Sequence, residues 1–307
     1  MKIIAPKNVD DLYSLASISL FAGISDYTDG IYNGDPFIPY EVAQKNQHNF
    51  LLDELGAKEG FKLLDVGCGL GTLLETAKER GAVGTGITIS SDQVLRCQQK
   101  GLDVRLFNYR SLPVSWNGKF DGIIANGSIE HFCQPKQALA GVQDSVYREM
   151  FSIFYRLLNP NSDSRRLATT TIHFSGKQLH PKRFLRNPFL QLLHRKGFHF
   201  SILYRGYGGY YPEAGQLKRC AKGLFELVKE VDGTEDYRIT SEYWCQALKT
   251  SLWQNREFKK RLFCSFFKKP VHTFWVVLSM MGPAAWPRQF RGENPPVRLY
   301  RQTWQMV

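Results

Sequence analysis

The sequence predicts an α/β fold, a doubly wound sheet with helices on both faces. Three observations predict it. An apolar run that begins at Lys62 ends in Asp65, and glycines follow at alternate positions, Gly67, Gly69 and Gly71. Strand-like and helix-like segments then alternate along the chain, as such a sheet requires. The polar motifs fall where predicted strands end, which is the edge at which these sheets bind ligands.

The elements follow in order from these patterns. The first strand turns sharply into a helix predicted over residues 72–80, whose amide N–H groups and positive dipole end face any ligand above the loop. Apolar runs predict the other strands and amphipathic periodicity the other helices. The further predicted strands are residues 82–89, 102–106, 120–125, 167–173, 224–231 and 297–305. The further predicted helices are residues 91–99, 147–158 and 241–249.

Length and composition bound the organisation of the chain. Its 307 residues, 43% of them hydrophobic, can bury a large core. We expect residues 1–55 to form an N-terminal helical lid and residues 56–307 the α/β domain, with an insertion at about 174–222 over the ligand-binding edge. The six cysteines show no paired spacing, which is typical of reduced thiols in a cytoplasmic protein. The start of the chain lacks a signal-peptide core, and the apolar run 274–286 is too short to span a bilayer.

The net charge of +12 is concentrated in two basic clusters. The first lies within residues 165–222, with Glu213 as its single acid, and the second within residues 256–269, with Glu257 as its single acid. Apolar side chains interleave the first cluster. This combination favours an anionic membrane surface, worth about 1 kcal/mol per basic residue, and peripheral association with the inner membrane face. A solvated face without a partner is the alternative; no nucleic-acid module accompanies the charge, so we expect no nucleic acid partner.

The spacing of the glycines indicates which cofactor the loop binds. The dinucleotide fingerprint is Gly-x-Gly-x-x-Gly, whereas this chain has Asp65-x-Gly67-x-Gly69-x-Gly71. That pattern resembles the first motif of class I methyltransferases, which bind S-adenosylmethionine (SAM). The resemblance implies that Asp65 faces the cationic amino end of SAM and that all three glycines leave space for the cofactor. An ordinary tight turn is the alternative interpretation.

Two later motifs narrow the resemblance to the cyclopropane fatty acid synthase and mycolic acid cyclopropane synthase family. The second strand closes with Thr88 and Gln93, where many class I methyltransferases place an acid that holds the ribose. The next motif has Asn108 where an aspartate is usual, and then Tyr109. The resemblance implies that Asn108 hydrogen-bonds the adenine and that Tyr109 packs on it.

The strand-four motif, residues 120–132, is also similar to that of the family and includes the pair Glu130-His131. The resemblance implies transfer of an electrophilic methyl group to a cis double bond of a lipid acyl chain. The resulting carbocation needs aromatic or anionic stabilisation, and a base then removes a proton. In the family a bound bicarbonate is that base. The positions that match its pocket are Asp29, Asn126, Glu130, Thr169 and Tyr237.

Two of these positions depart from the family pattern. Tyr27-Thr28-Asp29-Gly30 stands where the family commonly has Tyr-Ser-Cys-Ala, and Tyr27 is expected beside the cofactor. A carboxylate at Asp29 would repel bicarbonate, and Thr169 replaces a histidine that would help to hold it. We therefore doubt bicarbonate and expect Asp29 or Glu130 to act as the base or to stabilise the cation; a turn-capping Asp29 is the alternative.

The leading hypothesis is a SAM-dependent C-methyltransferase of unsaturated lipid acyl chains. A small-molecule C- or N-methyltransferase of the same family is the rival, with Asp29 paired to a substrate ammonium. A catalytically silent cofactor-binding protein is the third hypothesis. The histidines at 173, 180, 194 and 199 show no convincing ligand spacing, so we expect no metal. The sequence carries no signal for the oligomeric state.

Overall fold

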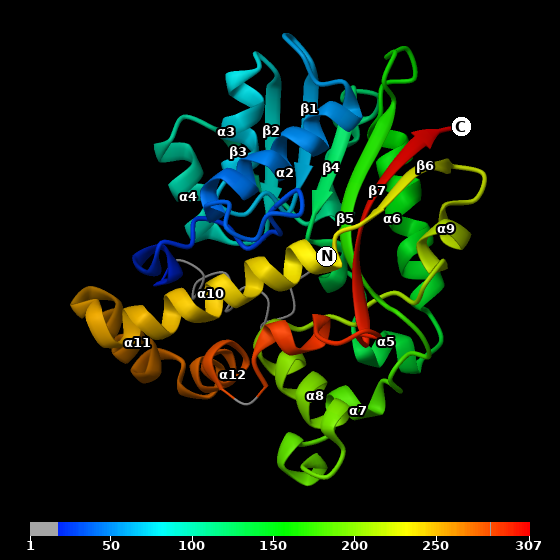
Figure 1. The fold of residues 1–307 in the computed structure, drawn as a ribbon. Coiled ribbons are helices and arrows are strands. Elements are labelled where there is room, and N and C mark those ends of the chain that lie inside the picture. The colour runs from blue at the N-terminus through cyan, green and yellow to red at the C-terminus, as the bar shows by residue number, and fades with distance from the viewer. Residues whose placement is uncertain (1–17, 283) are drawn as a thin grey trace.

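A seven-stranded sheet of order β3-β2-β1-β4-β5-β7-β6 forms the centre of the computed structural model, which describes residues 18–282 and 284–307 (Figure 1). The strands are β1 (Lys62–Val66), β2 (Val83–Thr88), β3 (Asp103–Leu106), β4 (Gly122–Asn126), β5 (Arg166–Phe174), β6 (Phe225–Asp232) and β7 (Val297–Met306). Strand β7 runs antiparallel to β5 and β6, and the other neighbours pair in parallel. Each predicted strand is confirmed to within two residues at either end. The predicted doubly wound sheet is therefore confirmed.

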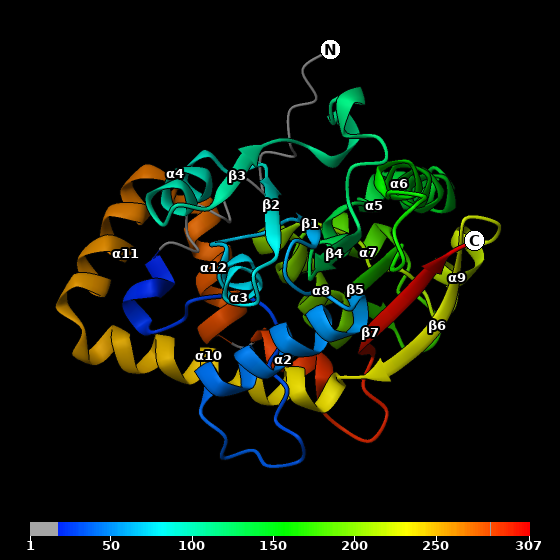
Figure 2. The ribbon, with the colours of Figure 1, turned by 90° about the horizontal axis from the view of Figure 1, so that it is seen from above.

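Helices cover both faces of the sheet, and Figure 2 shows α2 and α6 on opposite sides of it. The helices of these two layers are α2 (Tyr40–Leu55), α3 (Thr72–Glu79), α4 (Ser91–Gln99), α5 (Pro135–Leu139), α6 (Gln143–Leu157) and α9 (Gln216–Ala221). Successive strand residues face opposite layers: Leu63 packs in the core with α2, α3 and α4, whereas Leu64 packs with α6 and α9. This is why the central strands β1, β4 and β5 are buried at nearly every position.

A second helical layer lies beyond the carboxyl ends of the parallel strands (Figure 1). It consists of α7 (Lys182–Leu185), α8 (Arg195–Tyr207), α10 (Thr234–Gln254), α11 (Arg256–Lys268) and α12 (Pro270–Met281). The short 3-10 helices are η1 (Leu20–Ala22), η2 (Tyr109–Ser111), η3 (Val114–Trp116), η4 (Ile129–His131), η5 (Pro188–Gln191) and η6 (Trp286–Phe290). A core of aromatic side chains joins this layer to β5 and β7. The sequence predicted only the first part of this helical layer, within residues 174–222, as an insertion over the ligand-binding edge. The second part, α10 to α12, lies in the chain between β6 and β7.

The predicted lid and domain boundary receive mixed support from the structure. Residues 1–17 of the lid lie outside the described residues. Helix α2 packs on the sheet through Leu51, Leu52 and Leu55, so it belongs to the α/β core. The division at residues 55 and 56 itself stays a prediction. Within the described part of the chain, no helix has the length and apolar character needed to cross a bilayer.

Candidate functional site

A cavity of about 930 Å³, its mouth included, lies at the carboxyl ends of β1, β4 and β5. Loops that follow β1 and β4 form one wall, and α8, α10, α12 and η6 form the other. The sheet and the second helical layer therefore meet around this cavity, at the edge where the sequence predicted a site.

The glycine-rich loop supplies part of the first wall. Gly67, Gly69 and Gly71 have φ of 84°, 54° and 78°, the left-handed region that favours glycine. A Cβ at Gly69 would meet nothing nearer than Asp26 Oδ1, at 4.0 Å, so this position faces open space. At Gly67 and Gly71 a Cβ would lie 2.6 Å from a neighbouring side chain. A side chain at these two positions would therefore collide with the protein itself; Gly67 still lines the cavity, and contact of the loop with a cofactor stays a prediction.

Two carboxylates lie at this end of the cavity. Asp65, at the end of β1, is buried, and its Oδ1 has no hydrogen-bond partner among the described residues. Burial raises the pKa of Asp65 well above its usual value, and the nearby Asp26 carboxylate raises it further. Asp26 lines the cavity, and its Oδ2 accepts a hydrogen bond from the Thr72 hydroxyl on α3. The Asp26 carboxylate lies beside the open Gly69 position, and this arrangement fits a cationic amino group such as the amino end of SAM.

Sequence reasoning missed Asp26. A single aspartate in a loop belongs to no periodic pattern, and its closeness to Gly69 arises only when residues 26 and 69 meet in the fold. The signal that could have found it is its place directly before Tyr27, which also lines the cavity.

The other predicted cofactor residues divide into two groups. Gln93 lines the cavity, and its Oε1 accepts a hydrogen bond of 2.6 Å from the Thr88 hydroxyl, which fixes its orientation. Asn108 instead caps η2. Tyr109 stacks on Phe132 with ring centroids 4.1 Å apart. The contact of Asn108 and Tyr109 with adenine stays a prediction.

Glu130 lies on η4, directly after β4, and its carboxylate reaches the cavity. Its Oε1 accepts a hydrogen bond of 2.8 Å from the N–H of Ile172, whereas Oε2 is buried without a partner among the described residues. Burial raises the pKa of Glu130 to about 7. A Cβ on Gly209 would lie 2.2 Å from the Glu130 carbonyl oxygen, so only glycine lets the loop after α8 support this residue. A carboxylate with a pKa near neutrality and one open oxygen suits a general base.

Asp29 has a different environment. It is 2% exposed, and its Oδ2 accepts two hydrogen bonds from the Arg301 guanidinium, one of them 2.8 Å from Nε. Its Oδ1 accepts from Gln47 Nε2 at 3.0 Å, and the same nitrogen donates to Asn126 Oδ1 at 2.8 Å. Arg301 also donates to Asp236 at 2.9 Å. Asn126 lines the cavity, but Asp29 is not among its lining residues. Arg301 and Gln47 were not identified from the sequence.

Thr169, the predicted counterpart of a bicarbonate-binding histidine, is fully buried in β5. Its hydroxyl accepts a hydrogen bond of 3.1 Å from Trp304 Nε1, and it does not line the cavity. The next residue, Thr170, donates instead to Asn126. His131 does line the cavity, and burial lowers its pKa to about 4, so it is neutral at physiological pH. Among the described residues, no group of His, Cys, Asp or Glu is arranged to hold a metal ion.

Aromatic side chains dominate the second wall. The six that line the cavity are Tyr27, Tyr207, Tyr211, Tyr237, Trp244 and Trp286. Trp244 makes edge contacts with Tyr27 and Tyr237, at centroid distances of 5.3 and 5.7 Å. Aromatic faces attract positive charge and offer apolar contact, so this wall suits an apolar substrate that becomes cationic during reaction.

The sheet order with an antiparallel β7, the glycine-rich loop after β1 and the cavity above it define a class I methyltransferase. The family described as mycolic acid cyclopropane synthetase matches residues 21–274, and the chain belongs to this family. The resemblance predicted from the motifs is thereby confirmed.

Individual relatives give the same result. The chain is 28% identical to cyclopropane mycolic acid synthase 1 of Mycobacterium tuberculosis over 225 residues, which are 70% of this chain and 71% of that protein. It is 34% identical to the cyclopropane-fatty-acyl-phospholipid synthase of Escherichia coli over 113 residues, 32% of this chain and 28% of that one.

Solved structures share the fold at lower identity. The cyclopropane synthase MmaA2 of Mycobacterium tuberculosis superposes with a TM-score of 0.74 at 19% identity, covering 100% of both chains. Coclaurine N-methyltransferase superposes with a TM-score of 0.72 at 14% identity, covering 99% of this chain and 84% of that one. A cyclopropane synthase and an N-methyltransferase thus share this architecture.

Proposed function

We propose that the protein is a SAM-dependent C-methyltransferase that acts on the double bond of an unsaturated lipid acyl chain. The observation that carries the proposal is Glu130, which lines a cavity walled by aromatic rings and whose buried Oε2 has no hydrogen-bond partner among the described residues. Such a wall accepts an apolar chain, and such a carboxylate can take a proton from it. The relatives named for cyclopropane products support the same substrate class.

The glycine end of the cavity would hold the cofactor. Gly69 offers the open approach, Asp26 and Asp65 face the cationic amino end, and Gln93, oriented by Thr88, is placed for the ribose. SAM bound there supplies an electrophilic methyl group.

Glu130 is the base in this proposal. The π electrons of the alkene form the new carbon–carbon bond to the methyl group, the carbon–sulfur bond breaks with its electron pair left on sulfur, and the other alkene carbon becomes cationic. The rings of Tyr237 and Trp244 stabilise that charge. Glu130 then accepts a proton, from the new methyl group to close a ring or from a neighbouring carbon to form a double bond.

Asp29 is a positioning residue on this account. Both of its oxygens are engaged, by Gln47 and Arg301, so it offers no free oxygen to a substrate. The amine rival depended on a free Asp29 beside a substrate ammonium, and this pairing removes its main support. In this proposal Glu130 takes the role that bicarbonate has in the family, so we expect turnover without added bicarbonate.

Labelled methyl transfer tests the function. The purified protein is incubated with methyl-labelled SAM and either vesicles of mixed unsaturated phospholipids or a polar metabolite extract, in buffer freed of carbon dioxide. The proposal expects label in the acyl chains, as a gain of one methylene, or of one methyl branch for an alkene product. Label confined to the polar fraction would contradict it and restore the small-molecule rival. Turnover that appears only when bicarbonate is added would remove Glu130 as the sole base.

A further inference from the structure

Helix α11 carries its large apolar side chains on the solvent side. The residues on its outward face, at spacings of four, three and four, are Arg256, Lys260, Phe263 and Phe267. Phe263 and Phe267 are 63% and 75% exposed, with ring centroids 4.7 Å apart. The inward face buries Phe258 but also Ser265. A helix that only packs on its own protein does the reverse, with apolar residues inward and charged residues outward.

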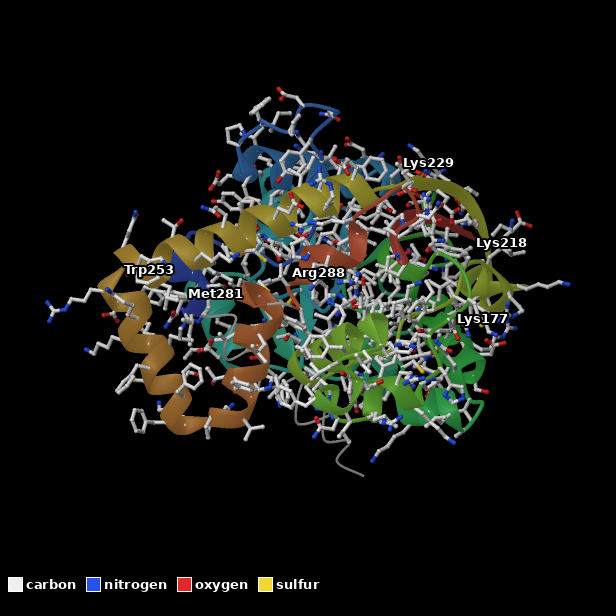
Figure 3. All side chains as sticks on the ribbon, turned by 60° about the horizontal axis from the view of Figure 1, so that its bottom comes forward. Lys177, Lys218, Lys229, Trp253, Met281 and Arg288 are labelled. Carbon is white, nitrogen blue, oxygen red and sulfur yellow. The ribbon has the colours of Figure 1, made fainter. Side chains whose placement is uncertain are left out.

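Helix α12 likewise buries polar side chains and exposes apolar ones. Thr273 and Ser279 are fully buried, whereas Val271 is 69% and Phe274 is 40% exposed. The Ser265 and Thr273 hydroxyls lie 2.8 Å apart and join the two helices through a polar seam. The hairpin of α11 and α12 therefore buries two hydroxyl groups among its inward apolar side chains and presents further apolar side chains outside. The exposed residues Phe263, Phe267, Val271 and Phe274, together with Trp253, form what we call the hairpin surface. Trp253 is 79% exposed and lies at the corner where α10 meets α11 (Figure 3).

The charge around the hairpin surface has one sign. Within residues 256–291 the single acidic residue is Glu257, and it pairs with Arg261 at 2.8 Å. Lys259, Lys260 and Lys268 are exposed beside the aromatic row. The other basic cluster is more dispersed: Figure 3 shows Lys177 and Lys218 on the side of the molecule away from Trp253. Exposed aromatic rings among lysines match the interface of an anionic bilayer, where rings enter the headgroup region and lysines meet lipid charge.

A second cavity lies directly beneath the hairpin surface. It encloses about 480 Å³, its mouth included, and Leu262 of α11 and Val276 and Met281 of α12 line it. Tyr27, Tyr207 and Met280 line both this cavity and the catalytic one. The hairpin thus separates the outer surface from an apolar space that adjoins the catalytic cavity.

We infer that the hairpin surface docks the protein on an anionic phospholipid bilayer, with the apolar space behind it as the path of an acyl chain toward Glu130. The path rests on the proposed function, whereas the docking does not. Binding is therefore measured without turnover, by co-sedimentation with vesicles containing about a quarter phosphatidylglycerol and with vesicles of phosphatidylcholine alone.

The expected result is binding to the anionic vesicles that weakens as salt is raised. Lys259→Gln/Lys260→Gln lowers the partition coefficient by about fivefold per lysine, roughly 25-fold in all. Phe263→Glu/Phe267→Glu lowers it by at least about tenfold. The matched controls are Lys58→Gln/Lys136→Gln and Phe37→Glu/Val114→Glu, which make the same charge changes at exposed positions elsewhere and leave binding within about twofold.

Three results would overturn the inference: wild type that ignores anionic vesicles, binding that survives both hairpin variants, or an equal loss in the controls. Since all substituted side chains are exposed, a thermal melt that matches wild type excludes misfolding as the cause. Capture of a small acidic carrier protein, lost in the hairpin variants while vesicle binding stays absent, would assign the surface to that partner. Docking without methyl transfer to lipid would leave the hairpin surface intact and remove the proposed function instead.

Discussion

Two of the buried carboxylates near the cavity, Glu130 and Asp29, are held in opposite ways. Both are at most 4% exposed. Glu130 takes one N–H bond from the backbone of Ile172 and keeps one oxygen open, whereas Asp29 is satisfied by the Arg301 guanidinium and by Gln47. Burial raises the pKa of both carboxyl groups, but Arg301 and Gln47 oppose the rise at Asp29, whereas Glu130 has no cationic partner and can exchange its proton near pH 7. These environments support the proposed division, in which Glu130 transfers a proton and Asp29 positions its neighbours.

The largest expected effect is a difference in catalytic rate between variants of Glu130 and of Asp29. Glu130→Gln keeps the shape of the side chain but removes the base, so kcat falls by about 10²- to 10⁴-fold. SAM binding, measured by calorimetry, stays within about threefold, because Glu130 lies beyond the glycine end of the cavity. Asp29→Asn, compared per folded molecule, loses far less activity. Equal losses in the two variants would break the distinction.

The second expected effect is the loss of stability when the ion pair of Asp29 with Arg301 is broken. Arg301→Met leaves Asp29 as an uncompensated buried charge and lowers the free energy of unfolding by about 3–5 kcal/mol in urea denaturation. The double variant Asp29→Asn/Arg301→Met costs less than Arg301→Met alone. Arg298, on the same strand, pairs with Asp232 at the surface, and Arg298→Met should cost no more than about 1 kcal/mol. If both arginines cost the same, Asp29 is not a buried fixed charge.

The third expected effect is a gain in stability on replacing a buried side chain, whereas such a replacement usually destabilises a protein. The pKa of Glu130 is raised from 4.5 to about 7 in the folded state, so between these values the folded protein binds more protons than the unfolded chain. The cost of burying the charged form therefore appears as pH rises through this window, and reaches about 3 kcal/mol above pH 7. Glu130→Gln should be more stable than wild type at pH 8 and nearly equal at pH 4.5. A variant that is less stable than wild type at pH 8 would show that Glu130 supports the fold as Asp29 does.

The smallest expected effect concerns the glycine end. Asp26→Asn removes a carboxylate proposed to face the cofactor amino group, and SAM binding weakens by about tenfold, the loss of one charge-assisted hydrogen bond. Asp53→Asn, at an exposed carboxylate paired with Arg80, is the control and leaves the affinity unchanged. An unaltered affinity in Asp26→Asn would leave Asp65 as the only acidic group for that end.

These contrasts also show how far the sequence could be interpreted. The sheet was predictable because its signals are local: each strand is a short apolar run, and the motif from Asp65 to Gly71 occupies one turn of chain. Glu130 was predictable for the same reason, since it follows β4 directly. The environment of Asp29 was not, because its partner Arg301 lies 272 residues away and enters the interior on β7, opposite Thr170 of β5. Position near a motif suggests a functional residue, but long-range pairing decides whether its charge is free.

The hairpin surface was also not predictable from the sequence, because it depends on how two helices pack. The sequence predicts that the apolar run 274–286 is too short to cross a bilayer, but composition alone does not say which side of a helix faces outward. Only the packing of α11 and α12, with Ser265 and Thr273 inside, shows that the apolar rows are exposed.

The most direct test of the central claim is the pH dependence of methyl transfer in a single turnover, with SAM and an unsaturated lipid both saturating, between about pH 5 and 9. If Glu130 is the base, the rate rises about tenfold per pH unit up to a break near pH 7 and is level above it. Glu130→Gln should lack this break, while Asp29→Asn should keep it. A wild-type profile that is flat across this range, or a break that survives in Glu130→Gln, would contradict the account.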